Sequence, residues 1–244
     1  MKKALIVSTF CTSLLLGCGH ESSEVEDYFP PDVPVPKPEP EPEPFTGNSV
    51  YFNEQDFVIT VVDSERETHP IVVGDFSANE ILLTHTGEFE GNLAKTKGIT
   101  QVSNTGDYLV NDTIAVTGEV SENGIYIYGD VNDQMVAYSL AKVSDSMNLA
   151  SLVGTHTNLV DGTTWRIAID GSFEINGSCI VNGTLRYNRY YFNVLGAEAS
   201  NCADDSFNGA YEGMMTTVTY QSDVYLSGII FNDTAVMWST AVKQ

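Results

Sequence analysis

The feature that most constrains the fold of this chain is a succession of short segments in which apolar and polar residues alternate. From residue 45 to residue 244 these segments are rich in Val, Ile, Thr, Tyr and Phe, and helical periodicity is almost absent. Turn-forming pairs separate many of them, because Asn-Gly and Asp-Gly tolerate positive φ. The pairs are Asn123-Gly124, Asp161-Gly162, Asp170-Gly171, Asn176-Gly177, Asn182-Gly183 and Asn208-Gly209. The pattern predicts an all-β protein.

The expected strands form two series. The first covers residues 57–62, 80–85, 88–93, 113–120, 125–131 and 134–142. The second covers residues 164–169, 172–175, 179–187, 190–195, 209–219, 224–231 and 234–242. Between them lies one candidate helix, residues 144–152, which is either a helix or a linker.

The two series resemble each other at two landmarks that occur in the same order. Residues 81–90 are similar to 167–174, and the hairpin 125–139 is similar to 224–239, with an Asn-Asp pair in both turns. The alternative is that hairpins of any β-protein resemble each other by composition. We predict duplicated β-domains over 48–145 and 150–244, each a small lipocalin-like barrel or a sandwich.

The amino terminus has the organisation of an export signal. Two lysines precede an apolar stretch from Ala4 to Leu16, which is too short for a membrane-spanning helix. The run Leu15-Leu16-Gly17-Cys18 resembles the lipobox of bacterial lipoproteins. An ordinary secretory signal with an incidental cysteine is the alternative.

The lipobox resemblance implies that residues 1–17 are removed and that Cys18 carries a diacylglycerol and a fatty acid. The membrane is then a partner through this lipid anchor, and the protein belongs to the bacterial cell envelope. The residue after the cysteine is Gly19 and not Asp, a pattern similar to that of Gram-negative lipoproteins exported to the outer membrane.

Residues 18–47 are predicted to be a disordered tether rich in Pro and Glu. Eight of the nine prolines lie between Pro30 and Pro44, where proline alternates with charged residues. Each proline fixes φ and removes a hydrogen-bond donor, so extended polyproline II is favoured. At about 3.1 Å per residue, this stretch reaches about 46 Å. The tether therefore predicts a stalk that holds the folded part away from a membrane.

The charge balance excludes one class of partner. The whole chain has 11 basic and 33 acidic residues, a formal net charge of −22. Without the signal and tether the folded part still carries about −17, a field that repels nucleic acid and anionic lipid. We therefore expect no nucleic-acid partner.

Two of the four cysteines remain for the folded part, once Cys11 leaves with the signal and Cys18 is lipidated. Cys179 and Cys202 belong to a protein exported to an oxidising compartment, so we expect a disulfide. Closing a loop of this length contributes about 3 kcal/mol on the chain-entropy model.

Motifs of known enzyme classes are absent from the sequence: it has no Gly-x-Ser-x-Gly, His-Glu-x-x-His, phosphate-binding or dinucleotide motif. Three histidines lie in the folded part, His69, His85 and His156, without metal-binding spacing. We therefore predict no catalytic residues, no resident metal and no cofactor besides the lipid.

Two further clusters are weaker candidates for binding. Hard oxygen ligands that suit calcium occur at Asp130, Asn132, Asp133, Asp204, Asp205 and Asn208, although Asx-rich β-turns have the same composition. Aromatic residues gather at Tyr187, Tyr190, Tyr191 and Phe192, with Trp165 and Trp238 elsewhere in the same series. Exposed on one face they would stack on a sugar or form a protein-binding patch, whereas buried they belong to a β-core.

These observations predict a non-enzymatic envelope lipoprotein that presents two β-domains for binding a protein or a glycan, or as an accessory component of an envelope assembly. An alternative is a carrier of an apolar or heme-like small molecule. A barrel cavity lined by aromatic side chains would favour the carrier, and two filled interiors would exclude it. A further alternative, an envelope hydrolase, requires a cleft with convergent polar groups.

Overall fold

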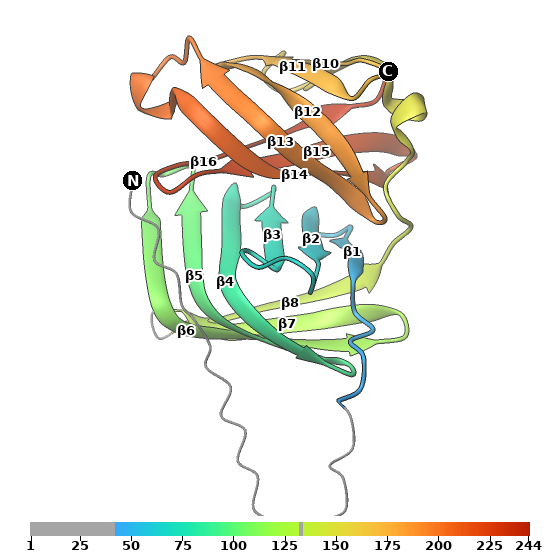
Figure 1. Cartoon of the computed structure of the whole chain (residues 1–244), viewed down its shortest axis with the longest axis vertical. Coiled ribbons are helices and arrows are strands. Elements are labelled where there is room, and N and C mark those ends of the chain that lie inside the picture. Colours follow the sequence, from blue (N-terminus) through green and yellow to red (C-terminus); the bar gives the residue numbers. More distant parts are fainter. Residues whose placement is uncertain (1–41, 132–133) are drawn as a thin grey trace, which may run out of the picture. The chain divides into compact units, whose positions relative to one another are not determined.

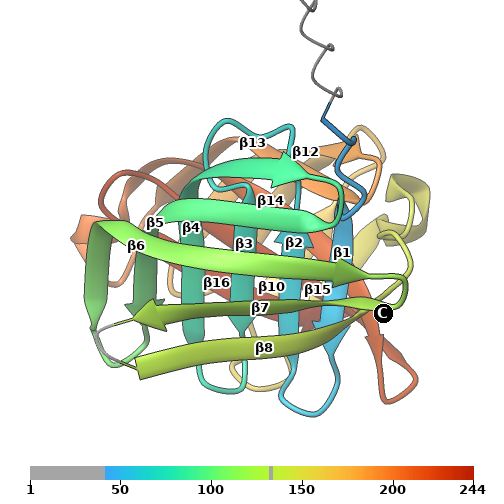
Figure 2. The same cartoon turned by 90° about the horizontal axis from the view of Figure 1, so that it is seen from below.

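The computed structural model describes residues 42–131 and 134–244 and shows two closed eight-stranded barrels in tandem (Figure 1). In each barrel every strand pairs antiparallel with its chain neighbours, and the last strand pairs with the first. Figure 2 shows β6, β7 and β8 side by side in this order. The predicted all-β class and the barrel alternative are confirmed.

Barrel 1 consists of β1 (Ser49–Asn53), β2 (Val58–Val62), β3 (Ile71–Asp75), β4 (Glu80–Glu90), β5 (Leu93–Ser103), β6 (Tyr108–Ser121), β7 (Gly124–Val131) and β8 (Gln134–Lys142). Barrel 2 consists of β9 (Gly154–Thr157), β10 (Thr164–Ile167), β11 (Ser172–Asn176), β12 (Ile180–Asn188), β13 (Tyr191–Ser200), β14 (Gly209–Tyr220), β15 (Asp223–Phe231) and β16 (Val236–Val242). Two short 3-10 turns, η1 (Leu149–Leu152) and η2 (Asp205–Phe207), complete the elements.

Four strands, β1, β3, β5 and β9, were not predicted from the sequence. In β1 and β3 four consecutive residues are buried, because these strands are covered on both faces. A strand that is buried on both faces loses the apolar-polar alternation that marks a half-exposed strand. The predicted strand 88–93 was also wrong, since it spans the β4–β5 turn, where Gly91 has φ of +54°.

The candidate helix 144–152 is mostly extended, and only η1 is helical. Several of its polar backbone groups bond to barrel 2, and within the segment the Ser151 amide donates to the Asn148 carbonyl at 3.0 Å. The Ser146 amide donates to the Tyr190 carbonyl at 2.8 Å, and the Met147 amide donates to Oγ1 of Thr217 at 2.9 Å. The segment is therefore a linker that is bound along its length to barrel 2.

Of the two pairs of similar segments, only one occupies equivalent positions in the two barrels. The aligned hairpins are β7–β8 and β15–β16, the last two strands of each barrel. In contrast, residues 81–90 lie within the single strand β4, whereas residues 167–174 run from β10 through a turn into β11. The early landmark therefore does not mark equivalent positions in the two barrels.

A third apolar core lies between the barrels. Inward side chains of β1 to β4, such as Val58, belong to the barrel 1 interior, while outward ones, such as Ile59 and Val72, pack against barrel 2. Barrel 2 contributes outward side chains of β13 to β16, including Met214 and Phe231. This shared core explains why β1 to β3 are buried on both faces.

Candidate ligand-binding cavity in the second barrel

The interiors of the two barrels differ. Barrel 1 is filled by side chains, with Tyr51 fully buried and its hydroxyl donating to the Gly47 carbonyl at 2.8 Å, and a void of only about 10 Å³ remains. Barrel 2 contains a cavity of about 130 Å³, the barrel 2 cavity. Its apolar wall includes Trp165, Phe173, Val181, Leu185, Met215 and Ile230. One barrel is therefore a filled core and the other is hollow.

The cavity opens at the seam of barrel 2. Strand β9 is only four residues long and meets β16 at a single position, where Thr157 pairs with Val242. Beyond this position the cavity wall is formed by polar residues that reach the surface, Asp161, Ser178 and Ser239. The mouth of the cavity therefore has a polar rim, formed by the β9–β10 loop, the β11–β12 turn and β16, around an apolar interior.

The β9–β10 loop, residues 158–163, forms one side of this mouth and is held by its own hydrogen bonds. Oδ1 of Asn158 accepts from the Val160 amide at 2.8 Å, and Oδ1 of Asp161 accepts from the Thr163 amide at 2.8 Å. Nδ2 of Asn158 donates to Oγ of Ser239 on β16 at 3.5 Å. These bonds fix the loop beside β16, although Val160 at its tip is 96% exposed.

The indole N–H of Trp165 on β10 is a polar group in the mainly apolar interior of barrel 2. Its side chain is 3% exposed and lines the cavity, and a Cβ at Gly228 would lie 2.7 Å from Cη2 of its ring. The indole Nε1 has no hydrogen-bond partner among the described residues. Three buried hydroxyls share this condition, those of Ser49, Thr60 and Thr216, and none of them lines the cavity. An unpaired buried donor costs about 1–3 kcal/mol.

The predicted disulfide is confirmed, and it borders the cavity. Cys179 and Cys202 are joined, and Cys179 is one of the wall residues. The bond attaches the β13–β14 loop to the start of β12, at the same end of the barrel as the cavity mouth. It therefore braces the wall of the hollow barrel.

A groove outside barrel 2 adjoins the cavity. Half-buried rings of Phe57, Phe76, Tyr220, Tyr225 and Trp238 surround it, and we refer to it as the aromatic groove. Its volume is about 420 Å³. The groove and the cavity share three wall residues, Asp161, Trp238 and Ser239. Of the five rings, the sequence singled out only Trp238, because the others come from distant turns and strands of both barrels.

A second inter-barrel hollow of about 650 Å³, the histidine cleft, contains His69, His85 and Phe231. His85 pairs through Nδ1 with Asp112 at 2.9 Å, and the rings of His69 and Phe231 lie 4.6 Å apart. Burial lowers the pKa of His69 below its usual value, and its φ is +52°. No described group of three or more His, Cys, Asp or Glu side chains is placed to hold a metal ion.

His156, the third histidine, forms hydrogen bonds to the backbone through both ring nitrogens. Its Nε2 donates to the Leu152 carbonyl at 2.8 Å, and its Nδ1 accepts from the Gln244 amide at 3.2 Å. Both ring nitrogens are therefore used to attach η1 and the chain end to β9.

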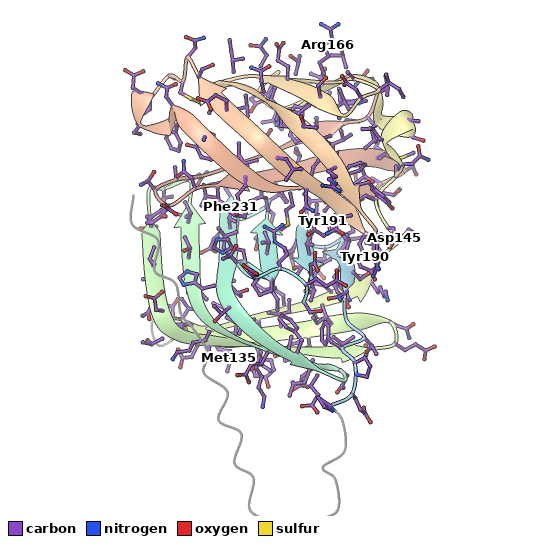
Figure 3. All side chains as sticks on the ribbon, viewed as in Figure 1. Met135, Asp145, Arg166, Tyr190, Tyr191 and Phe231 are labelled. Carbon is purple, nitrogen blue, oxygen red and sulfur yellow. A yellow bond between two sulfur atoms is a disulfide. The ribbon has the colours of Figure 1, made fainter. Side chains whose placement is uncertain are left out.

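The four aromatic residues singled out by the sequence do not form one exposed face. Tyr191 and Phe192 have no exposed surface: Tyr191 belongs to the core between the barrels and Phe192 to the barrel 2 interior. Tyr190 is partly buried beside Tyr191 where the barrels meet (Figure 3), and Tyr187 is 46% exposed. The buried alternative holds for Tyr191 and Phe192.

The candidate calcium residues are dispersed. Asn132 and Asp133 lie outside the described residues, and Asp130 is an exposed residue of β7. Asp204 accepts from the Ser206 amide at 2.9 Å, and Asp205 accepts from Nδ2 of Asn208 at 3.1 Å. Hydrogen bonding to Ser206 lowers the pKa of Asp204. These carboxylates stabilise the turn around η2.

The fold defines this chain as a tandem pair of closed, antiparallel eight-stranded barrels, one filled and one hollow. No protein-family model matches the sequence, and no curated protein or solved structure matches it. In the described part of the chain, no helix is long and apolar enough to cross a membrane.

Proposed function

We propose that this chain is a non-enzymatic envelope lipoprotein whose second barrel binds a small apolar molecule carrying a hydrogen-bond acceptor. The observation that carries the proposal is the barrel 2 cavity, whose apolar wall includes a buried indole donor without a partner. An acceptor on the ligand would satisfy Nε1 of Trp165, and the rest of the ligand would displace water from apolar surface.

The cavity size limits the apolar part of the ligand. A protein cavity of about 150 Å³ lined by apolar side chains takes up benzene. The barrel 2 cavity, at about 130 Å³, therefore suits one six-membered ring or a chain of similar volume. A heme-sized ligand does not fit this volume. We therefore propose a carrier of a small apolar molecule and not of a heme-like one.

The predicted anchor and stalk support the location of this activity. Cys18 and the Pro-Glu tether lie outside the described residues, and their roles stay part of the proposal. Lipid at Cys18 would keep the barrels at the bacterial envelope. There barrel 2 would bind small molecules within the distance that the tether spans. Barrel 1, with its filled interior, would serve as the platform that covers one face of barrel 2.

Two matched probes test the proposal by isothermal titration calorimetry. Cyclohexanone and methylenecyclohexane have nearly the same shape, but only the ketone accepts a hydrogen bond. We expect cyclohexanone to bind about fivefold more tightly, the value of one net hydrogen bond. In Trp165→Phe, which keeps an aromatic ring and loses the N–H, this preference should disappear.

Tyr126→Phe is the control, because Tyr126 is an exposed residue of barrel 1 that does not line the cavity. The control should keep the preference for the ketone. The proposal fails if neither probe binds the folded protein, or if Trp165→Phe discriminates between the two probes as well as the unmodified protein does.

A further inference from the structure

We propose that the aromatic groove and the barrel 2 cavity form one site for an amphiphile, whose apolar end enters the barrel and whose neutral saccharide head lies in the groove. This inference rests on the proposed function, because the cavity must accept the apolar end. It adds a second subsite and the chemical class of the head.

The first observation is that the two hollows share a wall. Asp161, Trp238 and Ser239 border both, so the two hollows lie next to each other beside β16 and the β9–β10 loop. The loop that carries Asp161 is attached to β16 through Asn158 and Ser239. This shared wall places the groove at the mouth of the cavity.

The second observation is the arrangement of the rings. Phe57 lies at the centre, with its ring centroid 5.0 Å from that of Tyr220, 5.2 Å from that of Tyr225 and 5.8 Å from that of Phe76. Phe57 holds a φ of +49°, which is uncommon outside glycine and persists where surrounding contacts fix it. The rings therefore pack edge to face or tilted against one another and line the groove with apolar surface, against which the C–H face of a sugar can pack.

The third observation is the polar rim, which identifies the head as neutral and rich in hydroxyls. Side chains of Asn79, Asn158, Ser239 and Thr240 supply amides and hydroxyls around the floor. Among the described residues that line the groove, Asp161 is acidic and none is basic. An anionic head would meet no counter-charge here, whereas sugar hydroxyls both donate to and accept from such groups.

The sizes agree with one small ligand. Small-molecule pockets typically measure about 300–1,000 Å³. The groove alone, at about 420 Å³, falls within this range and accommodates a saccharide head, while the cavity takes a single ring. Joining two weak subsites through one molecule raises the affinity, because binding of the first part places the second at high effective concentration.

The test compares three classes of probe by calorimetry with the full chain. Phenol represents the apolar end, methyl glycosides represent the head, and phenyl β-glycosides of glucose, galactose, mannose and N-acetylglucosamine combine them. We expect at least one phenyl glycoside to bind about tenfold or more tightly than phenol and than its own methyl glycoside. Phenyl β-D-glucuronide, which adds a carboxylate to the head, should bind more weakly than phenyl β-D-glucoside.

Variants assign the gain to the groove. Tyr225→Ala and the milder Thr240→Val should reduce phenyl glycoside affinity toward that of phenol while leaving phenol binding unchanged. Tyr126→Ala is the control, because Tyr126 is an exposed residue of barrel 1 that does not line the groove. Circular dichroism and thermal unfolding verify that each variant is folded.

The outcomes separate the two proposals. If phenol binds and no phenyl glycoside binds more tightly, the saccharide subsite is wrong and the cavity stands. If phenol, the ketone and the glycosides all fail to bind, both proposals fall. If the gain survives in Tyr225→Ala and Thr240→Val alike, the head does not lie in the aromatic groove.

Discussion

The hydroxyl of Tyr191 in barrel 2 donates a hydrogen bond to Oδ2 of Asp63 in barrel 1 at 2.6 Å, and both residues are buried. Nδ2 of Asn188 donates to the same oxygen at 3.0 Å. Burial raises the pKa of Tyr191, so its hydroxyl stays protonated and remains a donor. Figure 3 labels Tyr191 where the two barrels meet. This contact fixes the β2–β3 loop of one barrel on the β12–β13 hairpin of the other.

Tyr191→Phe removes this donor without changing the shape of the ring. We expect the free energy of unfolding to fall by about 2 kcal/mol, because a buried carboxylate loses a strong hydrogen bond. Urea denaturation measures the change. Tyr187→Phe is the control, since the Tyr187 side chain is 46% exposed and its 3.3 Å bond to the Ser146 carbonyl is long. Equal losses in the two variants would contradict the role assigned to Tyr191.

A fall in pH should destabilise the folded protein, because it protonates His69 in the histidine cleft. Burial lowers the pKa of His69, and the charges of His85 and Arg66 lower it further. The hydrogen bond to the Thr84 carbonyl and the charge of Glu212 oppose this shift only in part. The neutral ring is therefore favoured in the folded state, so the stabilisation is present above about pH 6.5 and is lost as the pH falls through the lowered pKa.

His69→Asn provides the comparison, because asparagine does not titrate and tolerates the positive φ at this position. Between about pH 7.5 and about pH 5 the unmodified protein should lose more unfolding free energy than the variant. Urea denaturation at both pH values measures the difference. An equal loss in the two proteins would show that His69 does not contribute.

Breaking the disulfide should affect both stability and the cavity. The double variant Cys179→Ser and Cys202→Ser is expected to lose about 3 kcal/mol of unfolding free energy on the chain-entropy model. Because Cys179 lines the barrel 2 cavity, cyclohexanone should also bind more weakly to the variant. Denaturation and calorimetry on the same sample measure both effects, and an unchanged denaturation midpoint would refute the first.

Cys18→Ser tests the lipid anchor. The unmodified chain expressed in a Gram-negative host should partition into the detergent phase and carry the mass of a diacylglycerol and a fatty acid. The serine variant should remain in the aqueous phase without this added mass. A cleaved and unacylated unmodified protein would show that the signal is an ordinary secretory one.

Sequence patterns identified the class and the β10–β11 hairpin because its turn residues are explicit, whereas the predicted turn Asn182-Gly183 lies inside β12 at a register shift. Asp170-Gly171 lies in the turn between β10 and β11, and Gly171 takes the positive φ that the pair suggests. The same reasoning failed for β1 and β3, whose alternation is erased by burial on both faces. Apolar-polar alternation identifies a strand that is buried on one face, but it is lost in a strand that is buried on both.

The candidate site could not be predicted from the sequence, because it depends on which way side chains point and on contacts between distant segments. Tyr191 and Phe192 are adjacent in the chain, yet neighbours on a strand point to opposite faces, so they enter different cores. The aromatic groove instead gathers Phe57 and Trp238, which are far apart in sequence. The cavity depends on how inward side chains fill the barrel, and composition does not specify that volume.

The core between the barrels also determines what happens when the chain is cut. A protease that cleaves the linker between Lys142 and Gly154 would find its two products still joined by apolar side chains and by the bond from Tyr191 to Asp63. Nicked protein should therefore migrate as one particle and melt in one transition. Either barrel produced alone would expose an apolar sheet face to water and should aggregate.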